Sequence, residues 1–154
     1  MIHGQTVTRW SLEYPCDGLI AVNDKAATTD ALKMAYKSAS TKKTFVWTYE
    51  AWKQKNQKVL DSKDQYFLIT KDPIQMKKIL VDDGFVPSDV KKVIVGPCND
   101  RPGATKLGNN QSITQEEAEA LEAIYQAGYE IEFALIKEAS IGSWSKFRGQ
   151  FGFN

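Results

Sequence analysis

The sequence predicts an α/β protein with one doubly wound, mostly parallel sheet and helices on both faces. Short apolar runs alternate with helical patterns along the chain, and βα repeats of this kind form parallel sheets. The strands are expected at residues 19–22, 44–47, 66–70 and 93–95. A length of 154 residues suits one continuous hydrophobic core. We therefore expect a single domain over residues 1–154.

Helix start and stop signals occupy the segments between these strands. Thr114, with Glu117 three residues later, forms a capping box and predicts a helix that Gly128 ends. Asp72 followed by Pro73 supplies an N-cap and a proline at the first helical position. Two further helices are expected, one after residues 28–30 with Leu32, Ala35 and Tyr36 facing inward, and one after Thr48 with Ala51 and Trp52 facing inward.

The later segments predict a sheet edge and a separate tail. Glycines punctuate residues 96–108, which favours a loop. Residues 129–136 alternate acidic and apolar side chains, which is typical of a strand exposed on one face. We therefore expect an edge hairpin or an antiparallel strand near an edge of the sheet. Residues 139–154 form an aromatic tail, in which either a helix docks a partner or the aromatic side chains pack onto their own sheet.

Composition and charge exclude several classes of function. The formal net charge of +1 gives no electrostatic argument for nucleic acid as a partner. No apolar run approaches the roughly 18–20 residues of a membrane span, and no signal peptide is recognisable. Cys16 and Cys98 lack the spacing of a metal site and favour reduced thiols. We expect a cytoplasmic protein without a metal.

His3 is the candidate catalytic residue because it is the only histidine in the sequence. A helical pattern follows it, with Val7, Trp10 and Tyr14 on one apolar face. Backbone N–H groups at a helix start attract an anion and disfavour a positively charged ring. An uncharged imidazole beside such an anion site is what a phosphoryl acceptor needs. The alternative is that His3 is a frayed terminal residue without a function.

Ligands of doubly wound sheets bind at the carboxyl ends of the strands. This rule selects four candidate site loops, which lie at His3, at Asn23-Asp24, at Thr70 and its successors, and from Gly96 onward. Each loop contains small or polar residues suited to an anion, and none is specific by itself.

Several blocks of the sequence resemble one family. Ile2-His3-Gly4-Gln5, with Trp10 seven residues after the histidine, is similar to the Leu-Ile-His-Gly-Gln-Val-x-x-x-Trp signature of enzyme IIB in the mannose/fructose/sorbose family of the sugar phosphotransferase system. Residues 95–105 resemble its Val-Gly-Gly-x-x-x-Arg-x-Gly-x-Thr, with Pro97 in place of the second glycine. Residues 68–73 and 109–113 are similar to two further motifs of the family. Their order along nearly the whole chain identifies a sorbose-type IIB component.

The resemblance implies a phosphocarrier. In that family the histidine of this motif accepts a phosphoryl group on Nδ1 from enzyme IIA, which implies His3 here. The group then passes to a sugar held by the membrane components IIC and IID, so that the protein is a protein-histidine–sugar phosphotransferase of the cytoplasm, peripherally associated with its permease. No cofactor is needed. The sugar cannot be named from the sequence, and a homodimer is left open.

Four further residues are expected to bind the phosphoryl group. Backbone amides near Gly4 and Gln5 would receive its charge, the Thr70 hydroxyl would hold a second oxygen, and Arg101 would pair with it bidentately. For Thr70 the alternative is an ordinary helix-start turn, and for Arg101 a solvent-exposed loop arginine. Cys98 lies in a late loop, unlike the phosphorylated cysteine of other IIB classes, so an unreactive thiol is expected.

One departure from the family concerns the start of the chain. Family members carry a central hydrophobic strand before the motif, ending in Asp-Asp-Arg-Leu, and Met1 stands at its final leucine. We expect that this first strand precedes Met1 in the full protein, or that another chain or the tail takes its place. The alternative function is a regulatory binding module of the same fold, inactive because the N-terminal strand is absent.

Overall fold

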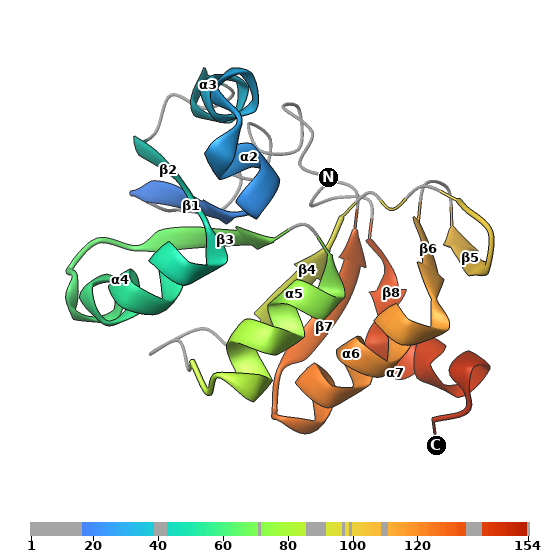
Figure 1. Cartoon of the computed structure of the whole chain (residues 1–154). Coiled ribbons are helices and arrows are strands. Elements are labelled where there is room, and N and C mark those ends of the chain that lie inside the picture. The colour runs from blue at the N-terminus through green and yellow to red at the C-terminus, as the bar shows by residue number, and fades with distance from the viewer. Residues whose placement is uncertain are drawn as a thin grey trace. The chain divides into compact units, whose positions relative to one another are not determined.

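The computed structural model describes residues 17–38, 43–70, 72–85, 92–96, 98, 100–108, 111–134 and 140–153. The chain divides into two compact units, Met1–Lys71 and Asp72–Asn154. Figure 1 shows strands and helices in both. The α/β class and the mostly parallel pairing are confirmed. One domain over residues 1–154 stays a prediction.

The sheet of the first unit is built around β1, Gly18–Val22. It lies between β2, Lys43–Trp47, and β3, Tyr66–Thr70, and both pairings are parallel. All five residues of β1 are buried. Gly18 is required there, because a Cβ at this position would lie 2.9 Å from the backbone oxygen of Lys43. The three predicted strands are therefore present, and their carboxyl ends share one edge of the sheet.

Helices cover both faces of this sheet, as predicted. Leu32 and Tyr36 of α3, Asp30–Ser38, pack against the cluster that contains Val46. Val46 and Trp47 point to opposite faces because side chains alternate along a strand. Trp47 lies 6.4 Å, centroid to centroid, from Trp52 of α4, Tyr49–Asp61, so α4 covers the other face.

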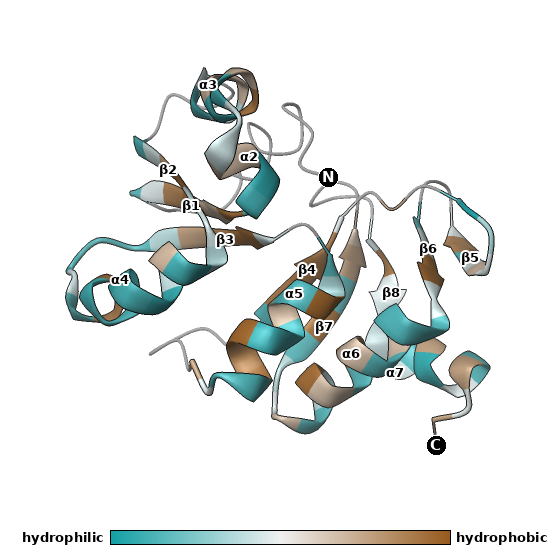
Figure 2. Cartoon of the chain, in the orientation of Figure 1, coloured by the Kyte–Doolittle hydropathy of each residue, from teal (hydrophilic) through white to brown (hydrophobic). Residues whose placement is uncertain are grey.

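The structure adds a helix that the sequence pattern did not reveal. α2, Asp24–Thr28, precedes α3 and is too short to show a hydrophobic period. Its N-cap is Asn23, whose Oδ1 accepts a hydrogen bond from the backbone N–H of Ala26 at 3.1 Å. In α4, by contrast, Thr48 is the N-cap, as predicted. Figure 2 shows that α4 is mostly hydrophilic along its length.

The second unit contains a three-stranded sheet in the order β4-β7-β8. β4, Lys92–Val95, and β7, Glu130–Ala134, are parallel, and β8, Ser140–Ser143, is antiparallel to β7. The predicted antiparallel strand is therefore present. The described part of residues 129–136 forms β7, which pairs with the edge strand β8 and so lies near an edge of this sheet, as predicted. Its acidic side chain Glu132 pairs with the neighbouring strand β4, with Lys92 Nζ 2.8 Å from Glu132 Oε2.

Residues 96–108 were expected to be a loop, and the structure corrects this in part. Residues Ala104–Gly108 form β5, which pairs with β6, Gln111–Thr114, as an antiparallel hairpin. Three helical segments complete this part of the unit: α5, Pro73–Lys77, a π-helical turn, Lys78–Asp82, and α6, Gln115–Gln126. Asp72 caps α5 and the Thr114–Glu117 capping box begins α6, both as predicted.

The aromatic tail packs onto its own unit. After β8 it forms α7, Trp144–Phe147, and a 3₁₀ turn, Arg148–Phe151. Phe133 of β7 contacts Trp144 and Phe147, with ring centroids 6.2 and 5.4 Å away. All three of these rings are buried, so the packing alternative is confirmed and the docking helix is wrong for the described residues.

Hydrogen bonds from Trp144 and Arg148 to Glu122 hold the tail against α6. Glu122 accepts hydrogen bonds from Arg148 Nε at 2.9 Å, Arg148 Nη2 at 2.6 Å and Trp144 Nε1 at 3.0 Å. The hydrogen bonds from Arg148 are the largest cause that lowers the pKa of Glu122 to about 2 from 4.5. Because the folded pKa is the lower one, this stabilisation is present above about pH 4.5 and is lost as the pH falls toward 2.

We expect Glu122→Gln to lower the free energy of unfolding by about 2 kcal/mol at neutral pH, because charge-assisted hydrogen bonds are lost. Denaturant unfolding between pH 7 and pH 2 measures it. The difference from the unmodified protein should shrink below about pH 4.5. Glu119→Gln, an exposed position of the same helix, is the control and should change stability little. A difference that does not depend on pH would contradict the assignment.

Candidate functional site

Two loops meet at the carboxyl edge of the first unit's sheet. The backbone N–H of Asn23 donates to the carbonyl of Trp47 at 3.0 Å, which continues the pairing of β1 and β2 beyond both strands. Asp24 Oδ1 then accepts from the backbone N–H of Tyr49 at 2.7 Å. Asn23 and Asp24 thus lie at the predicted edge, where their side chains cap α2 and tie the β1 loop to the start of α4.

Thr70 ends the third strand at the same edge. It pairs with Val22 in the parallel register and is half-buried. Two residues later Asp72 Oδ1 accepts from the backbone N–H of Gln75 at 2.9 Å, with Pro73 in the first turn of α5. Thr70 therefore stands between a strand end and a helix start, which suits a hydroxyl that donates to an anion. Its role stays a prediction.

The loop after β4 is held by β6 at two points. Gln111 Nε2 donates to the carbonyl of Val95 at 3.0 Å, and the backbone N–H of Ser112 donates to the carbonyl of Cys98 at 3.0 Å. Gln111 and Ser112 are both buried. Gly96 lies between these two hydrogen-bonded points, and its part in the site stays a prediction.

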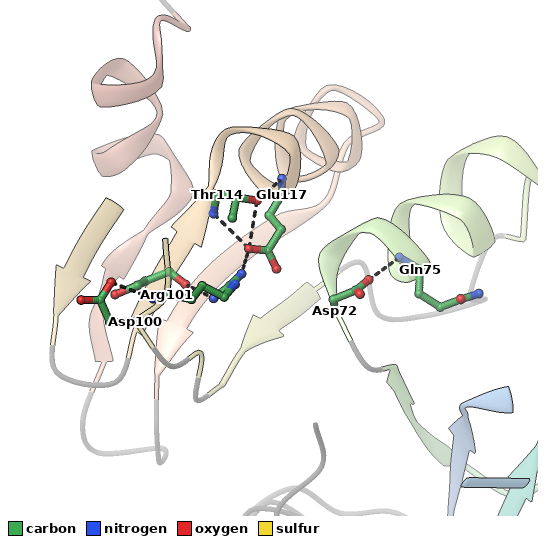
Figure 3. A network of polar contacts seen from close by, with 7 residues as sticks. Asp72, Gln75, Asp100, Arg101, Thr114 and Glu117 are labelled. Atoms are coloured by element: carbon green, nitrogen blue, oxygen red, sulfur yellow. Dashed lines mark hydrogen bonds and ion pairs between the residues drawn. The ribbon is translucent and has the colours of Figure 1, made fainter. Parts of the chain in front are cut away.

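Arg101 lies in the same loop and is held by the start of α6. Its Nη2 forms an ion pair with Glu117 Oε1, and its Nη1 donates to the carbonyl of Ser112 at 3.3 Å (Figure 3). Its backbone N–H also donates to Asp100 Oδ1 at 3.0 Å. The side chain retains 37% exposure, against 8% for that of Glu117. Arg101 is therefore ordered by contacts within the protein, unlike the plain solvent-exposed loop arginine that was the alternative.

The surroundings of Cys98 favour its neutral thiol. Burial is the first cause that raises its pKa, the Glu117 carboxylate raises it further, and the Arg101 guanidinium opposes both. Thiolate, not thiol, is the reactive species. This agrees with the expected unreactive thiol.

The predicted site residues fall into three groups. Asn23, Asp24 and Thr70 share one edge of the first unit, while Gly96 and Arg101 share one loop of the second. His3, Gly4 and Gln5 and the helix expected after them lie outside the described residues. Sequence reasoning missed the contact of Glu117 with Arg101, because the capping box already accounted for that glutamate and nothing local links two residues 16 apart.

The described ranges contain neither a cluster of metal-ligating side chains nor a membrane-spanning helix. Nowhere in them do three His, Cys, Asp or Glu side chains gather as metal ligands would. None of the helices in the same ranges is long and apolar enough to span a membrane.

Comparison with known proteins gives one family and one fold. The sequence model of a family described as the PTS system sorbose subfamily IIB component matches residues 1–153. No curated protein sequence matches the chain. The crystal structure of the IIBSor domain of the sorbose permease from Klebsiella pneumoniae superimposes with a TM-score of 0.77 at 18% identity, over 96% of this chain and 90% of that one.

Two further crystal structures show the same fold. The N-acetylgalactosamine-specific IIB component 1 of the PTS system from Escherichia coli gives a TM-score of 0.75 at 21% identity, over 88% of this chain and 87% of that one. A PTS-dependent N-acetyl-galactosamine IIB component from Streptococcus pyogenes gives 0.74 at 16%, over 91% and 87%.

The buried surroundings of Cys98 should slow its alkylation. In a Cys16→Ser variant, we expect iodoacetamide at pH 7 to alkylate Cys98 at least about tenfold more slowly than in the unfolded chain, because burial and Glu117 disfavour the thiolate. Mass spectrometry of timed samples measures the rate. Equal rates in the folded and unfolded protein would contradict the interpretation of Cys98 as an unreactive thiol.

Proposed function

Because the chain belongs to the sorbose subfamily of IIB components of the phosphotransferase system, we propose that it is a phosphocarrier whose His3 accepts a phosphoryl group and passes it to a sugar. The observation that carries the proposal is the family match over residues 1–153, which includes the segment Ile2-His3-Gly4-Gln5 with the only histidine of the sequence.

Two displacements at phosphorus make up the proposed reaction. In the first, the Nδ1 lone pair of neutral His3 attacks the phosphohistidine of enzyme IIA, and the phosphorus–nitrogen bond of the donor breaks with its electron pair returning to the donor ring. In the second, a sugar hydroxyl oxygen attacks the phosphoryl group on His3. The bond to Nδ1 breaks, and the hydroxyl proton leaves to the freed imidazole or to water. The reaction consumes no redox equivalent and requires a free ring nitrogen at the start.

The phosphoryl group carries about two negative charges, and each half-transferred state needs donors around it. Backbone amides of Gly4 and Gln5, the Thr70 hydroxyl and the Arg101 guanidinium take this part in the proposal. Two features of the described residues support it: Thr70 ends a strand at the carboxyl edge of a parallel sheet, and Arg101 retains an exposed portion of its side chain beyond its contact with Glu117.

The partners that we propose are those of the family. Enzyme IIA is the phosphoryl donor, and the membrane components IIC and IID hold the sugar, so the protein works as a peripheral part of a permease. The rival is a regulatory binding module of the same fold that takes no phosphoryl group. The two differ in one measurable property, the presence of phosphohistidine.

We expect label from radioactive phosphoenolpyruvate to appear on the protein in the presence of the general phosphocarrier components and a cognate IIA. The label should be acid-labile, as a phosphorus–nitrogen bond is, and at least about a hundredfold weaker on His3→Ala, because the accepting nitrogen is gone. Gel autoradiography before and after acid treatment measures it.

Cys98→Ser is the matched control, since it removes the other nucleophile near a predicted site loop, and it should retain the label. Acid-stable label, or label that persists on His3→Ala, would overturn the assignment of His3. Absence of label on the unmodified protein would leave the binding module.

A further inference from the structure

Strand β2 carries two aromatic side chains on the sheet face that α4 covers. Phe45 and Trp47 point to this face together, because they are two residues apart on a strand. Their ring centroids lie 5.4 Å apart, and both residues are half-buried. Among the described strands β2 pairs with β1 alone, so it is an edge of this sheet. The two rings therefore form a partly exposed aromatic surface at the edge of the first unit, beside α4.

Lysines lie over both rings. Lys43 Nζ is 5.6 Å from the ring centroid of Phe45, and Lys55 Nζ of α4 is 4.9 Å from that of Trp47. A ring face attracts a cation, so the rings hold these two ammonium groups at the surface. Lys58 follows Lys55 by three residues and so lies on the same side of α4. All three lysines are exposed. We name this surface the lysine–aromatic strip, which consists of Lys43, Phe45, Trp47, Lys55 and Lys58.

The strip is positively charged, and the carboxylates at its borders point elsewhere. None of its three lysines forms an ion pair with another residue that the structure describes. Asp61 Oδ1 accepts from Gln57 Nε2 at 3.1 Å, and Gln57, two residues after Lys55, points to the opposite side of α4. Glu50 is turned by about 140° from Lys55 around the same helix. Asp17 Oδ2 accepts from the backbone N–H before β3, on the other side of β1 from β2.

The side chains of the strip suit a surface with many spread negative charges. Arginine is the residue that pairs with a single carboxylate in a fixed bidentate geometry, and residues 17–38 and 43–70 contain none. Lysine carries a strongly hydrated charge on a flexible stem, which fits the wet headgroup layer of an anionic membrane. Aromatic side chains with one face exposed are enriched in the same layer. An acidic protein surface would instead require the lysines to lose water against fixed carboxylates.

We propose that the lysine–aromatic strip binds an anionic lipid surface and holds the first unit against the headgroups beside the permease. The place beside a permease rests on the proposed function, whereas the lipid contact rests on the strip alone. Each lysine near an anionic membrane raises partitioning about fivefold, so three lysines together raise it about a hundredfold.

The test is co-sedimentation of the whole chain with lipid vesicles at low salt. One set of vesicles contains phosphatidylcholine with about one third phosphatidylglycerol, and the other contains phosphatidylcholine alone. We expect the protein to partition onto the anionic vesicles about a hundredfold more strongly than onto the neutral ones. The difference should disappear at about 0.5 M salt, because screening removes the attraction between exposed charges.

The strip variant combines Lys43→Gln, Lys55→Gln and Lys58→Gln. Glutamine keeps a long polar side chain at these exposed positions and removes only the charge. We expect the preference of this variant for anionic vesicles to fall to less than about fivefold, because the attraction of three lysines is lost. Circular dichroism confirms that the variant is folded.

The matched control combines Lys25→Gln, Lys33→Gln and Lys37→Gln. These lysines belong to α2 and α3, which pack with Val46 on the opposite face of the sheet. Both variants lose three positive charges, so the formal net charge falls from +1 to −2 in each. The control should bind anionic vesicles within about threefold of the unmodified protein. Equal losses in the two variants would overturn the proposal, since net charge and not the strip would then govern binding.

The remaining outcomes separate the lipid contact from other partners and from phosphoryl transfer. Absence of binding to anionic vesicles overturns the proposal. If the strip variant then leaves a poly-L-glutamate column at lower salt than the control, an acidic polypeptide is the partner instead. Vesicle binding without acid-labile label supports the lipid contact and contradicts the phosphocarrier. Label without vesicle binding overturns the lipid contact and leaves the phosphocarrier intact.

Discussion

The parallel pairing of β1 with both of its neighbours is the constraint on which the first unit depends. Burying Leu19, Ile20 and Val22 stabilises the fold by roughly 1.5–3 kcal/mol each, which is a large part of the about 5–15 kcal/mol of a typical domain. The register then places Val22 beside Trp47 and Thr70. The hydrogen-bond ladder therefore decides that the loops after these strands leave from one edge, whatever residues the loops contain.

The loop after β4 depends on a different kind of constraint. Side chains and backbone groups of β6 and α6 hold it at Val95, Cys98 and Arg101. Each of these hydrogen bonds, like the ion pair, gives a partner to a polar group whose burial without one would cost free energy. A loop fixed in this way presents its residues in one arrangement, which is the preorganisation that the proposed phosphoryl contact of Arg101 needs.

Features that arise from local chemistry could be predicted from the sequence. The N-caps at Thr48 and Asp72 and the Thr114–Glu117 capping box involve residues three apart, and the predicted strands are short apolar runs. The strand order around β7 could not be predicted, because strand order is decided by pairing with residues that are distant in sequence. Its acidic residues predicted one exposed face near an edge, but no sequence pattern revealed that Glu132 pairs with Lys92 on the neighbouring strand.

The same distinction applies to the candidate site. Asn23, Asp24 and Thr70 were found by the rule for strand ends, and the structure places them at one edge. The hairpin over Ala104–Thr114 was missed because glycines in this segment resemble those of a loop, and only the pairing of β5 with β6 shows otherwise. The partner of Arg101 was missed because a salt bridge between separate elements leaves no periodic signal.

The packing of the tail has a consequence for biosynthesis. Trp144, Phe147 and Phe151 belong to the buried interior of the second unit, in contact with β7 or with one another. Domains tend to fold in the order in which the ribosome delivers them. The interior of the second unit cannot be completed before Trp144, Phe147 and Phe151 have left the ribosome, so Phe133 of β7 lacks its covering rings until then.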